Sequence, residues 1–551
     1  METPYVIGLD FGTDSVRALL VNAQTGEERD TEVAFYPRWK KGLYSIPQKA
    51  QFRHHPKDYI ETLQQVIANI TQRNPDIKNN IVALAVDTTA STVCLIDENA
   101  QPLAMQDQFK DNPNAMFVIW KDHTAQSEAD QINALLQTQP TNYAQNSGNH
   151  YSAECFWAKV MHLLRSDEQL RNNAYAAIEL CDYIPALLTG THNANDIKMG
   201  HCAAASKIMW DESWGGYPPA SFFEKLDPIL LPIRNHLPST NFGCHTSAGK
   251  LTKEWADILG LKEGIPVGIG NIDSHSGAVG SGVKHGTTIM NLGTSACFMS
   301  VMAPEEMGSH IVDGIFGQVN GSILHGQIGF ESGLSAYGDV FAWFKNLLAW
   351  PLRRLVAKEN HELAEKLEDD ILQQLTAEAE KLNITIDSPL ATDWFNGRRS
   401  PFPNNSLTAA ITGLNLSTNA PEIYYALAES TCFAAKKIID HLDKNGVVIE
   451  KLIGIGGIAQ KSPFIMQMLA DALGRTIDVS ECKQAGAMGS VIHAAVVAGI
   501  YPTVADAQKS LCKPIKKSYQ PDAERGKLLL RRYQRYEALG AFTESEQEKN
   551  Y

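Results

Sequence analysis

The residues best suited to chemistry near the start of the chain are Asp10, Gly12, Thr13 and Ser15. Gly12 lets the backbone approach an anion without a Cβ in the way, and the amides and hydroxyls of Thr13 and Ser15 can donate to phosphate oxygens. Asp10 is placed to hold a magnesium ion, directly or through water. The pattern indicates a phosphate cradle with a magnesium anchor, and the alternative from this segment alone is a plain β-hairpin with a solvated aspartate.

These side chains must be positioned by a strand, a tight turn and a second strand. Residues 5–9 are apolar, and Val16, Ala18 and Leu20 alternate inward with the period of a strand. A Walker loop or a dinucleotide fingerprint would instead lead from a strand into a helix. The Asp-Phe-Gly motif of protein kinases is excluded, because the chain contains no His-Arg-Asp catalytic loop.

The same Gly-Thr device recurs about half a chain later, at Gly293 and Thr294 between two strand-like runs. Two such hairpins predict a duplicated domain whose halves face each other across a nucleotide, each turn binding the phosphates from one side. A third segment runs as a strand into Gly456, Gly457 and Ala459 and continues as a helical run. Its bare glycines are expected to let a flat purine lie against the backbone.

Asp273 is the candidate for acid–base chemistry. It follows the strand-like residues 265–269 and begins a Gly/Ser-rich helix near the predicted cleft. A carboxylate there can accept the proton of an attacking hydroxyl during phosphoryl transfer, and the helix N-terminus favours the transferring anion. Taken alone, an aspartate that opens a helix is more often an N-cap.

Together these motifs resemble the FGGY carbohydrate kinases, which have the actin-like, ribonuclease-H-like ATPase fold. The match runs from about residue 5 to about residue 499, and within the family it is most similar to the bacterial ribulokinases, which phosphorylate L-ribulose. The segments of closest resemblance are residues 8–20, 52–56, 86–92, 112–116, 120–124 and 393–399.

The resemblance implies a role for individual residues. Asp273 matches the catalytic base, and Ala90, Lys207 and Glu331, together with Asp273, match residues that line the sugar. Lys207 and Glu331 also make physical sense as donor and acceptor for vicinal hydroxyls, although each alone would more often be an ion-paired charge.

Two further residues, Trp120 and Asp122, are candidates for a wall that faces the sugar. Core packing is an equal alternative for Trp120. The cofactors implied by the resemblance are ATP and Mg²⁺, and the implied product is L-ribulose 5-phosphate, an intermediate of L-arabinose breakdown, with D-ribulose or ribitol-like polyols as secondary substrates.

The expected fold class is α/β, with two actin-like domains that flank a nucleotide and sugar cleft. We expect an N-terminal domain over residues 1–280 that binds the sugar and carries the base, and an ATP-binding domain over residues 281–500. A helical C-terminal tail is expected over residues 501–551. At 551 residues and 44% hydrophobic content, the chain can bury two large cores.

Charge and cysteine content exclude several other classes. The net charge of −14 argues against a nucleic-acid partner, because duplex binding relies on clustered Lys and Arg. The nine cysteines are odd in number and scattered, which predicts neither a disulfide framework nor a zinc site. No signal peptide or membrane-spanning stretch is expected, so a cytoplasmic location and no membrane partner are predicted. A homodimer is compatible with the sequence.

Two other functions remain open at this point. An actin-like or chaperone-like ATPase would share both phosphate hairpins but would need no sugar. A dinucleotide oxidoreductase would use Gly454, Gly456 and Ala459 with Asp478, but it leaves both Gly-Thr hairpins unexplained.

Overall fold

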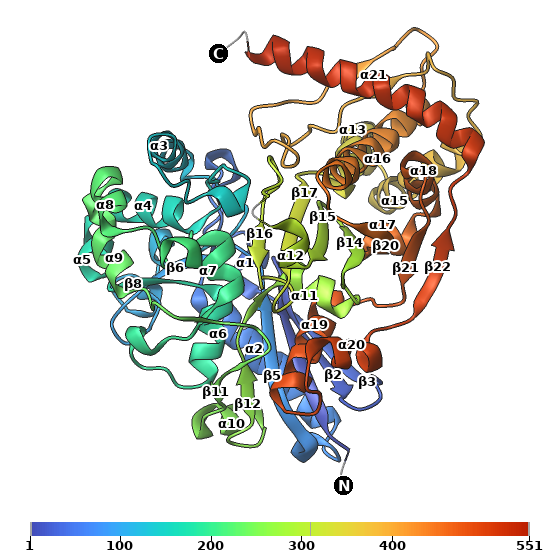
Figure 1. Ribbon diagram of the computed structural model, residues 1–551. Coiled ribbons are helices and arrows are strands. Elements are labelled where there is room, and N and C mark those ends of the chain that lie inside the picture. The colour runs from blue at the N-terminus through green and yellow to red at the C-terminus, as the bar shows by residue number, and fades with distance from the viewer. Residues whose placement is uncertain (1–2, 309, 549–551) are drawn as a thin grey trace.

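Two seven-stranded β-sheets carry most of the fold, one from each half of the sequence (Figure 1). The computed structural model describes residues 3–308 and 310–548. The strands of the first sheet, in spatial order, are β11 (Ser247–Lys250), β12 (Pro266–Gly268), β5 (Ile81–Thr88), β1 (Tyr5–Phe11), β2 (Ser15–Asn22) and β3 (Glu28–Phe35), with β13 (Asn271–Ile272) also paired to β5. This architecture confirms the predicted α/β class.

The second sheet repeats the order and directions of the first. In each sheet a central strand pairs with one antiparallel and one parallel neighbour: β1 with β2 and β5, and β14 with β15 and β20. Its strands, in spatial order, are β16 (Gln318–Asn320), β17 (Ile328–Leu334), β15 (Ala296–Met302), β14 (Gly286–Leu292), β20 (Ile449–Ile455), β21 (Ile477–Ser480) and β22 (Ile515–Tyr519). The repeat gives a physical basis for two equivalent Gly-Thr turns.

Both faces of the central strands of the first sheet are buried. On β1, Ile7, Leu9 and Phe11 join the core beneath α2 (Pro56–Arg73), whereas Val6 joins a separate core that includes α19 (Ala485–Val497). Strands that are covered on both faces have continuous apolar sequences instead of alternating ones. The sequence pattern identified only one of these two faces.

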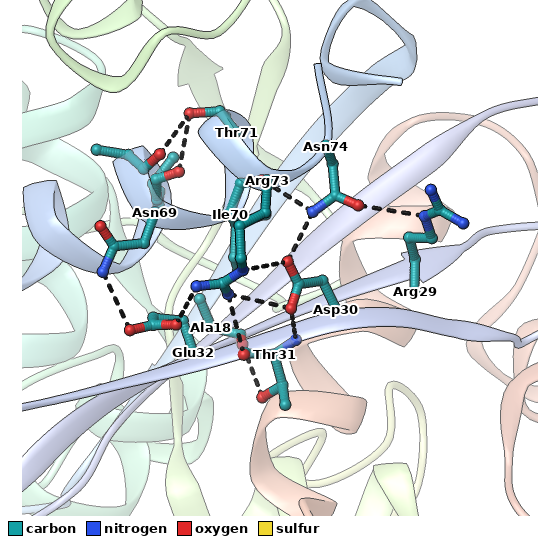
Figure 2. A network of polar contacts seen from close by, with 12 residues as sticks. Ala18, Arg29, Asp30, Thr31, Glu32, Asn69, Ile70, Thr71, Arg73 and Asn74 are labelled. Carbon is teal, nitrogen blue, oxygen red and sulfur yellow. Dashed lines mark hydrogen bonds and ion pairs between the residues drawn. The ribbon is translucent and has the colours of Figure 1, made fainter. Parts of the chain in front are cut away.

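Helix α2 is fixed to the outer strand β3 by polar contacts at its C-terminal end (Figure 2). The Arg73 guanidinium donates to Asp30 at 3.0 Å and to Glu32 at 2.6 Å, and the Asn74 amide donates to Asp30 at 2.6 Å. These contacts are exposed or half-buried, so their main effect is to orient the helix.

A smaller four-stranded sheet and several helices enlarge the N-terminal half. The strands, in order, are β4 (Arg53–His54), β7 (Phe117–Val118), β6 (Val93–Ile96) and β8 (Ala176–Glu179). The helices of this half include α4 (Phe156–Ser166), α7 (His201–Lys207) and α11 (Asp273–Gly280). The helices of the C-terminal half include α13 (Gly338–Leu348), α15 (His361–Ala379), α16 (Ala420–Lys444), α17 (Gly456–Lys461), α18 (Pro463–Leu473), α20 (Val504–Leu511) and α21 (Ala523–Glu548).

Helices α11 and α19 pack against each other between the two sheets (Figure 1). A Cβ at Gly280 would lie 2.2 Å from the Ala485 carbonyl oxygen, and a Cβ at Gly489 would lie 1.9 Å from that of Ser276. The two backbones therefore touch, and only glycine fits at either position. Helix α19 also lies on β1, where a Cβ at Gly8 would meet the Ala487 carbonyl oxygen at 2.1 Å.

The C-terminal segment is more integrated than expected. Strand β22 extends the second sheet beside β21, and α20 contacts α19 and α11. The described part of the predicted helical tail, residues 501–548, contains the helices α20 and α21 and also the strand β22, which was not predicted. Lys516 and Lys517 lie on this exposed edge strand, where charges are typical. The domain boundary near residue 280 stays a prediction.

Candidate active site

A cleft of about 370 Å³ opens between the two Gly-Thr turns. Its lining includes residues from both sheets, from the turn after β5, from α7 and α11, and from the N-terminus of α19. The sequence-predicted residues that line it are Asp10, Gly12, Thr13, Ala90, Trp120, Lys207, Asp273, Thr294, Glu331 and Gly456.

The two Gly-Thr turns have matching geometry. The Gly12 N–H donates to the Ser15 carbonyl at 2.9 Å, and the Gly293 N–H donates to the Ser295 carbonyl at 2.9 Å. Each bond closes its turn and directs the following threonine into the cleft. Such paired turns present backbone and hydroxyl donors from opposite sides, as binding of a phosphate chain requires.

Three carboxyl groups approach one another at the base of the cleft. Asp10 and Asp87 are opposite each other on paired strands β1 and β5, and Asp273 begins α11 after β13, which also pairs with β5. Burial and the neighbouring Asp10 raise the pKa of Asp87 well above its usual value. The Ser490 hydroxyl donates to Asp87 Oδ2 at 2.5 Å.

The Asp273 carboxyl has an unusual proton affinity. Burial, followed by the charge of Asp10, raises its pKa to about 7, although the Ser274 N–H donates to its Oδ1 at 2.6 Å. A carboxylate with a pKa near neutrality can both lose and accept a proton at physiological pH. Asp273 is also the first residue of α11 and lines the cleft, so its carboxyl group is accessible from the cleft.

Three cationic side chains surround the Glu331 carboxylate in the cleft. Lys207 Nζ lies 3.5 Å and His275 Nε2 lies 3.2 Å from Glu331 Oε2, and an Arg399 nitrogen lies 3.7 Å from Oε1. Burial opposes ionisation, but Lys207 and His275 together hold the pKa of Glu331 below its usual range. Glu331 is therefore an anion that can accept from hydroxyls, beside an ammonium group that can donate to them.

Trp120 lies in the cleft beside the first Gly-Thr turn. Its indole Nε1 donates to the Thr13 hydroxyl at 3.0 Å, and its ring is half-buried and lines the cleft. Trp120 therefore lines the cleft, as predicted. Its hydrogen bond to Thr13 in the first Gly-Thr turn was not predicted from the sequence.

Five sequence-predicted residues do not line this cleft. Gly293 closes its turn, and Ser15 begins β2. Gly457 is exposed on α17, and Ala459 is on the buried side of the same helix. Asp122 is fully buried, and the proposal that it faces the sugar does not fit its contacts. Its carboxylate pairs with Arg53, accepts from the Phe52 N–H at 2.6 Å, and accepts from Thr124.

The backbone at Gly456 passes close to the end of β14. Its φ is +87°, and a Cβ there would lie 2.7 Å from the Leu292 carbonyl oxygen. This position and the adjacent exposed Gly457 leave an open backbone surface at the start of α17. That surface fits the expected purine neighbourhood, which remains a prediction.

Several cleft residues were not singled out from the sequence. Arg17 contacts Asp10 at 3.3 Å, and Glu154 and Arg399 approach each other at 4.0 Å. At the start of α19, a Cβ on Gly486 would lie 3.1 Å from Asp10 and 3.2 Å from Asp87. Arg399 lies in one of the family-like segments and Gly486 belongs to a Gly-Ala run, whereas no local signal marks Glu154.

The residues present fit ATP and Mg²⁺. Mg²⁺ is commonly held by one or two carboxylates together with substrate phosphates and water. Asp10 lines the cleft between the phosphate turns, and the buried Asp87 Oδ1 has no hydrogen-bond partner among the described residues. The start of α19 adds the positive end of a helix dipole beside the same carboxylates.

A cleft between two similar sheets, lined by two Gly-Thr turns, a carboxyl group of raised pKa and an ion-paired glutamate, fits one class of protein: a two-domain kinase that transfers phosphate to an alcohol. Residues 5–280 match the N-terminal domain of the FGGY family of carbohydrate kinases, and residues 289–498 match the C-terminal domain of that family.

Full-length relatives agree with these matches. The chain is 44% identical over 548 residues to a protein named ribulokinase from Vibrio parahaemolyticus, covering 98% of this chain and 96% of that protein. It is 32% identical over 554 residues to a ribulokinase from Halalkalibacterium halodurans, covering 98% and 95%.

Solved structures share the fold. A xylulose kinase from Rhodospirillum rubrum aligns with a TM-score of 0.75 at 20% identity, covering 99% of this chain and 100% of that one. A Plasmodium falciparum glycerol kinase aligns with a TM-score of 0.72 at 15% identity, covering 97% of both.

The chain belongs to the FGGY family of carbohydrate kinases. It phosphorylates a sugar with ATP and Mg²⁺, and the alternatives of a sugar-independent ATPase and a dinucleotide oxidoreductase are set aside. No helix among the described residues is long and apolar enough to cross a membrane.

Proposed function

We propose that this kinase transfers the γ-phosphoryl group of ATP to the 5-hydroxyl of L-ribulose, with Asp273 as the general base. The observation that carries the choice of sugar is the full-length similarity to ribulokinases, which reaches 44% identity. The choice of base is supported by the position of Asp273 in the cleft and by its pKa of about 7.

In this mechanism Asp273 takes the proton of the attacking hydroxyl as the new O–P bond forms and the bond to ADP breaks. A well-placed base of this kind contributes about 10²–10⁴ in rate. Thr13 and Thr294 hold the phosphates from opposite sides, and Gly456 and its neighbours Gly457 and Ala459 are assigned to the adenosine end. Mg²⁺, held by Asp10 directly or through water, would neutralise charge on the phosphate oxygens.

The sugar is assigned to the end of the cleft formed by Ala90, Trp120, Lys207 and Glu331. The ammonium of Lys207 donates to one hydroxyl and Glu331 accepts from a neighbouring one, so the pair orients the chain of the sugar toward Asp273. Closure of the two halves excludes water, which would otherwise compete as the acceptor.

A steady-state assay of ADP release tests this function. L-ribulose, D-ribulose, D-xylulose, ribitol, glycerol and a sugar-free control are compared, and phosphorus NMR locates the phosphate on the product. We expect L-ribulose to give the highest kcat/KM and a 5-phosphate. A higher kcat/KM with another sugar would contradict the substrate while leaving the family unchanged.

Two further predictions concern the cell and the assembly. We retain a cytoplasmic location, which the nine free cysteines support, and a homodimer as a possible assembly. Cell fractionation measures the location, and sedimentation velocity measures the oligomeric state.

A further inference from the structure

Lys159 is a buried lysine that the mechanism above does not use. It lies in the first turn of α4, is 1% exposed, and its Nζ donates to three backbone carbonyls. The acceptors are the carbonyl oxygens of Ser91, of Val118 at 3.3 Å and of Ile119 at 3.0 Å. Burial of a lysine is costly, so this arrangement calls for a specific explanation.

The three carbonyls belong to two segments that line the sugar end of the cleft. Ser91 is in the turn between β5 and β6 and lines the cleft next to Ala90. Ile119 directly precedes Trp120, which also lines the cleft. One ammonium group therefore joins the backbone beside Ala90 to the backbone beside Trp120.

The chemistry of the contact requires a charged lysine. Each partner is a carbonyl and can only accept, and an ammonium supplies the three N–H groups that three carbonyls need. A neutral amine has one fewer proton and would leave one buried carbonyl without a donor. Burial lowers the pKa of Lys159 to about 8, opposed by the nearby Glu179 and Glu154 and by Cys155, while Arg53 lowers it further.

The turn that Lys159 holds has an unfavourable backbone geometry. Ser91 has φ +53°, in the left-handed region that non-glycine residues seldom adopt. The turn is also tied at Thr92, whose N–H donates to Glu179 Oε2 at 2.8 Å, and at Thr89, whose N–H donates to the Phe11 carbonyl at 2.9 Å. Strained turns persist only where the surroundings fix them.

We propose that Lys159 is a positioning residue that sets the width of the sugar pocket by clamping the Ala90–Ser91 turn to the backbone that carries Trp120. The proposal rests on the assignment of this end of the cleft to the sugar. In the described structure Lys159 itself contacts neither phosphate turn and is connected to the first one only through other residues, such as Trp120, which donates to Thr13. We therefore expect its loss to affect sugar binding more than nucleotide binding.

The test is steady-state kinetics of Lys159→Met with both substrates varied. We expect the KM for the preferred sugar to rise at least tenfold, and the KM for Mg·ATP to change less than threefold. Lys159→Arg keeps the charge, but its planar guanidinium cannot reproduce the three contacts, so an intermediate sugar KM is expected.

Leu163→Ala is the matched control, because Leu163 is fully buried in the same helix and belongs to the apolar core. It removes buried apolar contacts and none of the three Lys159 hydrogen bonds, so we expect a lower melting temperature and a sugar KM within threefold of wild type. Glu179→Gln replaces the carboxyl group that acts on Lys159 by its charge and also accepts from the Thr92 N–H of the same turn. It is the second variant, to be used if Lys159→Met does not fold. It should raise the sugar KM at least threefold with the KM for Mg·ATP unchanged.

The outcomes separate this role from the proposed substrate. The assay uses whichever sugar the wild type prefers, so failure with L-ribulose contradicts the substrate alone. Equal changes in the two KM values, or a Leu163→Ala variant that matches Lys159→Met, would overturn the positioning role. An unchanged sugar KM in a folded Lys159→Met variant would do the same.

Discussion

At the scale of single residues, the proposed role of Asp273 as the base predicts how the reaction depends on pH. Its pKa is raised to about 7, first by burial and then by Asp10, and only the deprotonated form can accept a proton. We therefore predict that kcat/KM falls about tenfold per pH unit below pH 7 and levels off above it. A profile of kcat/KM from pH 5 to 9 measures this, and a flat profile down to pH 5 would contradict the assignment.

Lys207 is predicted to act on the sugar rather than on folding. In Lys207→Met, Glu331 keeps His275 and Arg399 as partners, so no unpaired charge is left buried. We expect a sugar KM at least about tenfold higher, corresponding to the loss of one charge-assisted hydrogen bond of about 1.5–3 kcal/mol. Lys198→Met, at an exposed position, is the control and should behave as wild type.

At the scale of elements, the contact between α11 and α19 places Asp273 beside Asp10. Gly489→Ala would put a Cβ 1.9 Å from the Ser276 carbonyl oxygen, so the two helices must separate. Overpacking of this kind costs about 1–3 kcal/mol or more. We predict a clearly lower melting temperature and reduced kcat.

The control for this change is Gly457→Ala, measured without nucleotide, because a Cβ there meets no atom within 4 Å. Its melting temperature should stay close to that of wild type. A Gly489→Ala protein with unchanged stability and activity would show that the helices do not need this close approach.

Local elements were largely predictable from the sequence. The hairpin of β1 and β2, the strand β20, and the helix α18 with Gly474 just beyond its end all follow from short-range patterns. The burial of Asp122 could not be predicted from the sequence, because its partner Arg53 is distant in sequence and an ion pair leaves no periodic signal. The edge strand β22 was missed since charged Lys residues in an exposed strand resemble a helix surface.

At the scale of the whole molecule, both halves contribute to the cleft and also contact each other beside it. The His201 ring Nε2 donates to the Asn320 carbonyl at 2.7 Å, and the Asn149 amide donates to Asp313 at 2.9 Å. Because the catalytic arrangement needs both halves together, we predict that ATP hydrolysis without sugar is on the order of a hundredfold slower than turnover with sugar. Comparable rates in the two conditions would contradict closure by the sugar.

The duplicated sheets were foreseen from two Gly-Thr turns, but the path of the chain between them was not. Helix α19 comes late in the sequence and packs on the first sheet, so its Gly486 lies against Asp10 and Asp87. Such a return is a property of tertiary packing, and no local pattern specifies it. The same reason explains why Glu154 and Arg399 meet in the cleft without a common motif.

The most direct test of the account is the turnover of Asp273→Asn, with Mg·ATP binding measured on the same preparation. Asparagine keeps the size of the side chain and cannot accept the proton. We predict that kcat falls by about 10²–10⁴, while the Kd for Mg·ATP and the melting temperature stay close to those of wild type. A variant that retains a tenth or more of wild-type kcat would show that Asp273 is not the base.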